Sequence, residues 1–141
     1  MQYKRFGAAY VLRLEMGDEI IESLRTLAEK EEIRGGFFYG LGAVKSVSLG
    51  YFDVEEKKYK EESFKQEFEL ASLVGNISLL DEKIIIHAHA TLADQDFKAF
   101  AGHLSRAEVT ATVEIFLRPT GGVLNRKHDP SIGLNFLDLG E

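Results

Sequence analysis

The pattern of apolar and polar residues predicts one long helix near the amino terminus. Residues 5–15 (RFGAAYVLRLE) alternate between apolar and polar positions from Tyr10 onward, which predicts a strand with one mostly apolar face. In the next segment, EIIESLRTLAEKEEI, apolar residues recur three and four positions apart and form one stripe of an amphipathic helix. We expect Asp18 to cap the start of this helix and Arg34-Gly35-Gly36 to end it.

The rest of the chain has the texture of strands separated by turns. Gly40-Leu41-Gly42 indicates a backbone bend between two strands, and EEKKYKEE indicates a mixed-charge hairpin tip. Residues 93–108 look irregular, whereas residues 109–119 alternate cleanly. The remaining strand patterns are SFKQEFELASLVGNISLLD, IIIHAHATL and a short closing strand at the end of NRKHDPSIGLNFLDL.

These elements predict an α+β fold with about six or seven strands and one main helix. Strand follows strand without intervening helices, so we expect a largely antiparallel sheet. We expect residues 1–141 to form a single domain, because the chain shows no repeat, linker or low-complexity segment. The helix is expected to cover one sheet face and to leave the other for loops or another subunit.

Composition narrows the classes of protein. Hydrophobic residues make up 45% of the chain, which is enough for a substantial core. No apolar run approaches the ~20 residues that a bilayer requires, and the start shows no signal-peptide pattern. Cysteine is absent, which excludes disulfides and thiolate metal sites. The cytoplasm is the simplest location, although a chain without cysteine suits other compartments too.

The net charge of −6 argues against a general nucleic-acid-binding surface. The chain has 23 acidic against 17 basic residues and a pI of about 5.3. Sequence-independent DNA binding depends on Lys and Arg side chains that neutralise phosphates. The densest basic segments are short, namely Lys57-Lys58-Tyr59-Lys60 and Arg126-Lys127-His128.

Two histidines in IIIHAHATL suggest a metal site. Because side chains alternate along a strand, His87 and His89 project from the same face, about 6.5 to 7 Å apart. His103 is the best third ligand, since an adjacent antiparallel strand can return it to this pair. Three neutral imidazoles with an open position suit zinc or another divalent transition metal. His128 is a weaker candidate, because its surroundings predict an exposed loop.

Other interpretations of these residues remain open. A His-x-His pair on a strand also occurs where both imidazoles simply form hydrogen bonds with neighbouring strands. Asp94 and Asp96 either accept hydrogen bonds from metal ligands or cap a turn. A cupin barrel also begins its metal motif with His-x-His, but this chain lacks the glutamate expected a few residues later.

The order of several motifs resembles the plant-and-prokaryote-conserved (PPC) domain family. These motifs are GLGAV, GNI, HAH and GHL, followed by the closing GLNFLDL, and the likeness covers nearly the whole chain. The resemblance implies an α+β homotrimer of the bare prokaryotic type, with metal binding at His87, His89 and His103. Plant members carry AT-hooks that bind DNA, and this chain has no Arg-Gly-Arg-Pro hook.

Two functional hypotheses follow from these observations. The first is a trimeric PPC-like protein, DNA-binding or transcription-associated by family label, with a three-histidine metal site. The second is a small metal-dependent enzyme, a hydrolase or lyase, with a zinc-like ion at the same histidines. A trimer would bury the abundant aromatic surface, and its formal charge of three times −6, or −18, disfavours duplex DNA further.

Overall fold

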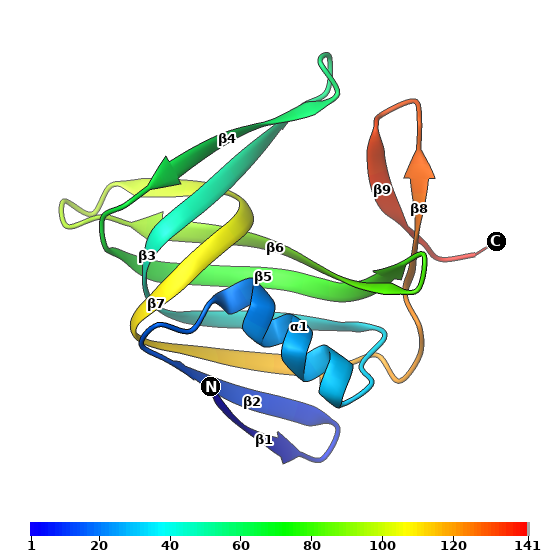
Figure 1. Cartoon of the computed structure of the whole chain (residues 1–141), viewed down its shortest axis with the longest axis horizontal. Helices are drawn as coiled ribbons and strands as arrows, with labels where there is room; N and C mark the ends of the chain where they lie inside the picture. The colour runs from blue at the N-terminus through cyan, green and yellow to red at the C-terminus, as the bar shows by residue number, and fades with distance from the viewer. Residues whose placement is uncertain (141) are drawn as a thin grey trace.

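A computed structural model describes residues 1–140 as one helix and nine strands (Figure 1). The helix is α1 (Ile20–Lys30). The strands are β1 (Gln2–Phe6), β2 (Ala9–Glu15), β3 (Gly36–Asp53), β4 (Lys58–Phe64), β5 (Phe68–Leu80), β6 (Lys83–Ala93), β7 (Ala99–Pro119), β8 (Asn125–Asp129) and β9 (Leu134–Asp138).

The α+β class is confirmed, but the predicted number of six or seven strands is too low for the part of the chain described. Residues 2–15 form a β1–β2 hairpin that turns at Gly7, where φ is +60°. The closing segment forms a second hairpin, β8–β9. Most of the segment predicted to be irregular belongs to β7. Strands β1 and β8 were missed because they are mostly polar and exposed, so they show little apolar alternation.

Helix α1 forms as predicted, but both of its ends differ from the prediction. Glu19, not Asp18, caps the start by accepting a hydrogen bond from the Glu22 backbone N–H at 2.8 Å. The Asp18 carboxylate instead lies 2.7 Å from the Met1 amino group. The helix ends at Lys30, before the glycines, and Glu31 then accepts hydrogen bonds from the hydroxyls of Tyr3 and Tyr10. Within residues 1–140 no helix is long and apolar enough to cross a bilayer.

The sheet is antiparallel except for one contact, and it closes on itself through β7. The start of β7 pairs with β6, and the remainder pairs with β2 and β3. Because β3 also pairs with β5, and β5 with β6, strands β3, β5, β6 and β7 form a closed ring. Figure 1 shows β7 as a strongly curved ribbon, yellow to orange, that makes this closure possible. The one parallel contact joins β5 to β8.

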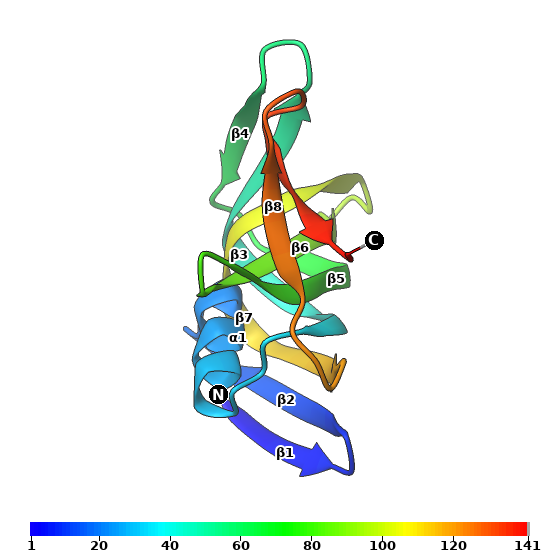
Figure 2. The same ribbon diagram turned by 90° about the vertical axis from the view of Figure 1, so that its right-hand side faces the viewer.

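The two faces of the sheet differ in burial. Helix α1 lies on one side of the sheet (Figure 2), where Leu24 and Leu27 are fully buried together with Leu12 and Ile115 of the sheet. The other face, which we call the outer face, carries large apolar side chains that are about half exposed in the single chain. They are Phe37, Tyr39, Leu41, Val74 and Phe116.

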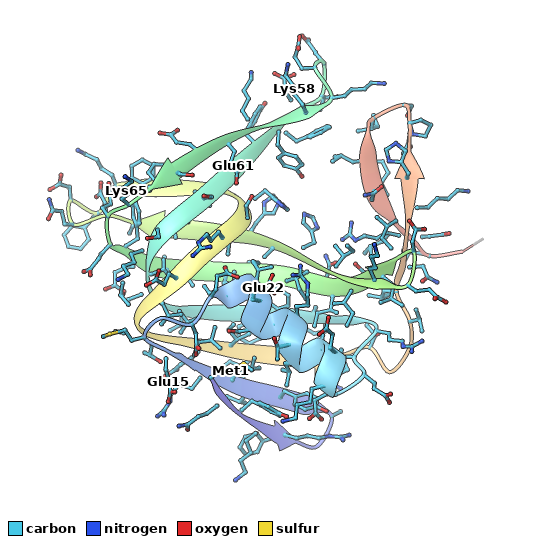
Figure 3. All side chains as sticks on the ribbon, viewed as in Figure 1. Met1, Glu15, Glu22, Lys58, Glu61 and Lys65 are labelled. Carbon is cyan, nitrogen blue, oxygen red and sulfur yellow. The ribbon has the colours of Figure 1, made fainter. Side chains whose placement is uncertain are left out.

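Two hairpin arms project from the ring. The first arm consists of the outer part of β3 together with β4, and it carries exposed charged side chains such as Lys58 and Glu61 (Figure 3). Its tip carries the predicted mixture of charges, including a 3.0 Å ion pair between Lys58 and Glu56. The second arm is the β8–β9 hairpin. The Leu79 N–H of β5 donates a hydrogen bond to the Leu124 carbonyl at 2.7 Å and so joins this arm to the sheet.

Glycines allow strands to approach closely inside the ring. At Gly42 φ is +154°, and the register of β3 shifts on both sides of it, so the predicted bend is a pair of bulges within one continuous strand. Gly75 of β5 lies beneath the Phe38 ring. A Cβ atom there would lie 2.4 Å from both the Phe38 ring and the His87 carbonyl oxygen.

We therefore predict that Gly75→Ala destabilises the protein by about 1–3 kcal/mol, the usual cost of overpacking a core. Gly122→Ala is the matched control, since an added Cβ at Gly122 meets no atom within 4 Å. Denaturant-induced unfolding of the two variants measures the difference. Equal free energies of unfolding would contradict the close approach of β5 and β3.

Candidate metal centre

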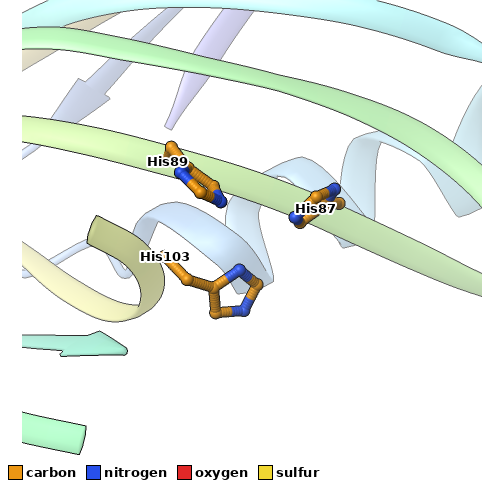
Figure 4. Close-up of side chains that lie close together, drawn as sticks. All are labelled: His87, His89 and His103. Atoms are coloured by element: carbon orange, nitrogen blue, oxygen red, sulfur yellow. The ribbon is translucent and has the colours of Figure 1, made fainter. Parts of the chain in front are cut away.

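Strands β6 and β7 place three histidines on one side of the sheet. His87 and His89 are separated by one residue on β6, so both side chains leave the same face, as predicted. His103 of β7 is the direct cross-strand partner of His89. Figure 4 shows the three rings turned toward one another.

The three rings lie close enough to share one ion. Ring centroids are 5.3 Å apart for His87 and His89, 5.2 Å for His87 and His103, and 5.6 Å for His89 and His103. One nitrogen from each ring lies within 4.8 Å of the others. Two ligands of a tetrahedral zinc site, each 2.0–2.1 Å from the ion, lie roughly 3.3 Å apart. The rings therefore need to move by only about an ångström to enclose an ion.

An unsatisfied nitrogen supports this use of the cluster. The Nδ1 atom of His103 is buried and has no hydrogen-bond partner within residues 1–140. A buried polar atom without a partner costs free energy, so it usually marks a missing water, ion or ligand. The residues present therefore fit a bound divalent ion, which would satisfy this nitrogen.

Burial keeps His87 and His103 in the form that binds metals. Desolvation, helped by the positive charge of Arg126, lowers the pKa of His87 to about 4. The pKa of His103 is also lowered, mainly by burial and then by the neighbouring His89. Metal ions bind the neutral imidazole, so near neutral pH these two rings need not lose a proton first.

The histidines line a cavity of about 800 Å³ between the two hairpin arms. Tyr59 of β4 packs against His103 with ring centroids 5.0 Å apart, and the β8–β9 arm contributes Phe136 and Leu137. Gly102 lets β7 approach β3, because a Cβ there would lie 2.9 Å from the Gly50 carbonyl oxygen. The site is thus open to a small molecule and lined by both apolar and polar groups.

Arg126 of β8 belongs to this site, although the sequence placed it only in a short basic segment. Its Nη2 lies 3.3 Å from His87 Nδ1, across a separation of 39 residues. No local motif marks such a residue, because the contact depends on where the β8–β9 arm docks. NRKHD is polar at every position, so the sequence predicted an exposed loop here and gave no signal of the strand that carries Arg126.

The other candidates from the sequence lie outside the cluster. His128 is on β8, not in a loop, and its exposed ring contacts Asn135 Oδ1 at 3.0 Å. The Asp94 carboxylate accepts hydrogen bonds from the backbone N–H groups of Asp96 and Lys98, so it caps a turn. Within residues 1–140 the cluster contains no carboxylate, unlike the cupin motif.

The fold and the site together define a class of protein, namely a strand-rich α+β domain with a histidine cluster on one sheet face. The family model of the Plants and Prokaryotes Conserved (PCC) domain, the PPC family named above, matches residues 1–120. The chain therefore belongs to this family. A comparison with curated proteins finds no match.

Solved structures agree with this membership. A protein from Bacteroides thetaiotaomicron, described as a candidate DNA-binding protein, is 30% identical over 97% of this chain and 96% of its own, with a TM-score of 0.94. A PPC protein from Pyrococcus horikoshii is 33% identical over 99% and 95% of the two chains, with a TM-score of 0.87. A metal-containing protein from Archaeoglobus fulgidus is 31% identical over 97% and 98%, with a TM-score of 0.87.

Proposed function

We propose that this protein is a metalloprotein that holds one divalent transition-metal ion, zinc or another, between His87, His89 and His103. The observation that carries the proposal is the convergence of three imidazoles, one of which, His103, has a buried Nδ1 without a hydrogen-bond partner among residues 1–140. The metal-containing relative from Archaeoglobus fulgidus supports it.

The surroundings of the cluster favour a role in small-molecule chemistry. Three protein ligands leave at least one coordination position open in a tetrahedral site, and here the cluster lines a cavity. A divalent ion in such a position supplies Lewis acidity, which polarises a substrate oxygen or activates water. The protein's own contribution is to orient the ligand between the two arms. A metal-dependent hydrolase or lyase is the enzyme class that this arrangement favours.

We expect the purified protein to contain about one divalent ion per chain. The double variant His87→Ala with His89→Ala should contain no bound ion, because the one remaining imidazole cannot hold it. Elemental analysis by mass spectrometry measures the content. His128→Ala is the matched control and should keep the full amount, since its ring is on β8 outside the cluster. Retention of full metal content by the double variant would show that the ion is held elsewhere.

We also propose that the protein assembles as a homotrimer through the outer face. One cross-strand row runs from Phe116 through Tyr39 and Val74 to His89 and His103. Tyr39 and Phe116 stack with centroids 5.3 Å apart, yet they remain 55% and 45% exposed. A clustered apolar surface of this kind favours association between copies, and cyclic closure limits its growth.

Light scattering after size exclusion should therefore give a mass of three times 15.8 kDa. Tyr39→Ser with Phe116→Ser should lower this mass, because it removes the stacked pair at the centre of the patch. The control is Phe6→Ser, which removes an aromatic ring that is 56% exposed on β1. A double variant with the mass of the wild type would mean that another surface drives assembly.

DNA binding is the second candidate function, and the descriptions of relatives from Bacteroides thetaiotaomicron and Ralstonia eutropha favour it. The net charge of −6 opposes it, as does the charge of −18 that three copies would carry. We therefore expect no binding to labelled duplex DNA at physiological salt, measured by fluorescence anisotropy. An affinity that falls steeply with rising salt would overturn this expectation.

We further propose that the whole chain, residues 1–141, acts as one domain. The family model ends at residue 120, but the β8–β9 arm beyond it supplies part of the cavity wall. Arg126, on this arm, contacts Asn76 and Ser78 of β5.

A further inference from the structure

The guanidinium of Arg126 is fixed beside the histidine cluster by three protein oxygens. Its Nε–H donates to Ser78 Oγ at 2.7 Å, Nη1 donates to the Asn135 carbonyl at 2.6 Å, and Nη2 donates to Asn76 Oδ1 at 2.9 Å. A guanidinium has five N–H groups, so two remain, one on Nη1 and one on Nη2. A long, flexible side chain is thus held in one position before any ligand arrives.

The charge of this group is not balanced by the protein. Arg126 is half-buried, and burial lowers its pKa. Among residues 1–140 no carboxylate forms an ion pair with it, although the chain has an excess of acidic residues. A half-buried cation without a counter-ion is costly, and a bound anion would offset that cost.

A metal ion at the cluster would take away one of the acceptors of Arg126. The second N–H of Nη2 lies toward His87 Nδ1 at 3.3 Å, and arginine can only donate. A neutral imidazole has one nitrogen lone pair. If His87 binds an ion through Nδ1, that lone pair is occupied, and if it binds through Nε2, Nδ1 carries the proton. In both cases this N–H of Arg126 lacks an acceptor once the ion is present.

The cavity wall indicates an organic anion. Around the cation and the imidazoles it is lined by apolar and aromatic side chains from several strands, including Tyr59, Ile85 and Phe136. A cavity of about 800 Å³ with convergent polar groups and apolar walls is typical of small-molecule sites. The acidic chain also favours a singly charged ligand over a phosphate dianion.

We propose that Arg126 binds the carboxylate of a small organic acid whose apolar part packs between the two hairpin arms. This inference rests on the proposed metal site, because it names the ligand class of the same cavity. Arg126 acts here as a binding residue that receives the anion at the edge of the histidine cluster.

Calorimetric titration of zinc-loaded protein with benzoate tests the proposal, with benzamide as the neutral isostere and inorganic phosphate as the competing anion. Arg126→Gln should retain zinc and weaken benzoate binding about tenfold or more, as expected for loss of a charge-assisted hydrogen bond. Lys127→Gln is the matched control, because it removes the same charge from an exposed neighbouring position and should leave binding within about twofold. Benzamide should bind more weakly than benzoate by a similar factor.

Two results would overturn the proposal. They are equal benzoate affinity for Arg126→Gln and wild type, and tighter Arg126-dependent binding of phosphate than of benzoate. If Arg126→Gln does not fold, the proposal is tested on the wild-type protein by the NMR resonance of the Arg126 Nε–H group. It should shift with benzoate and not with benzamide, and an unchanged resonance counts against the proposal.

The same measurements separate this proposal from that of the metal site. A wild-type protein that takes up no zinc contradicts the metal site itself. The benzoate titration of metal-free protein then tests Arg126 alone, since one N–H on Nη1 still lacks an acceptor. A wild-type protein that holds its full complement of zinc but does not bind benzoate contradicts only the role of Arg126.

Discussion

The double pairing of β7 is the constraint on which the site depends. This strand is hydrogen-bonded to β6 at its start and to β2 and β3 further along, so it must bend strongly between them. The bend places His103 directly opposite His89 and closes the ring of strands. Backbone hydrogen bonds, which are costly to leave unmade in a core, thereby hold two of the three imidazoles in position.

Charge is distributed unevenly in this molecule. The chain is acidic overall, whereas the cavity contains a half-buried guanidinium and two imidazoles, His87 and His103, whose pKa values are lowered mainly by burial. An acidic exterior disfavours polyanionic partners, whereas under the proposal above the charge of Arg126 favours small anions between the arms. Net charge alone therefore describes which large partners are disfavoured and says little about the ligand of the cavity.

The sequence predicted the features that depend on local periodicity. The period of two places His87 and His89 on one face, and the apolar stripe of 20–30 defines α1. Features set by distant contacts escaped prediction. Asp18 has the side chain of a helix cap but pairs with Met1, which leaves Glu19 to cap the helix. Arg126 escaped because no spacing rule links β8 to β6. The metal itself, the trimer and the one-domain organisation stay predictions.

The histidines and the guanidinium belong to separately built parts of the fold. The imidazoles stand on the closed ring, whereas Arg126 stands on a terminal hairpin that meets the ring through one parallel contact and a few hydrogen bonds. A hairpin attached in this way can be exchanged for another without disturbing the strands that carry the imidazoles. If relatives bind different compounds, we therefore expect their sequences to differ most in the last twenty or so residues, while His87, His89 and His103 stay unchanged.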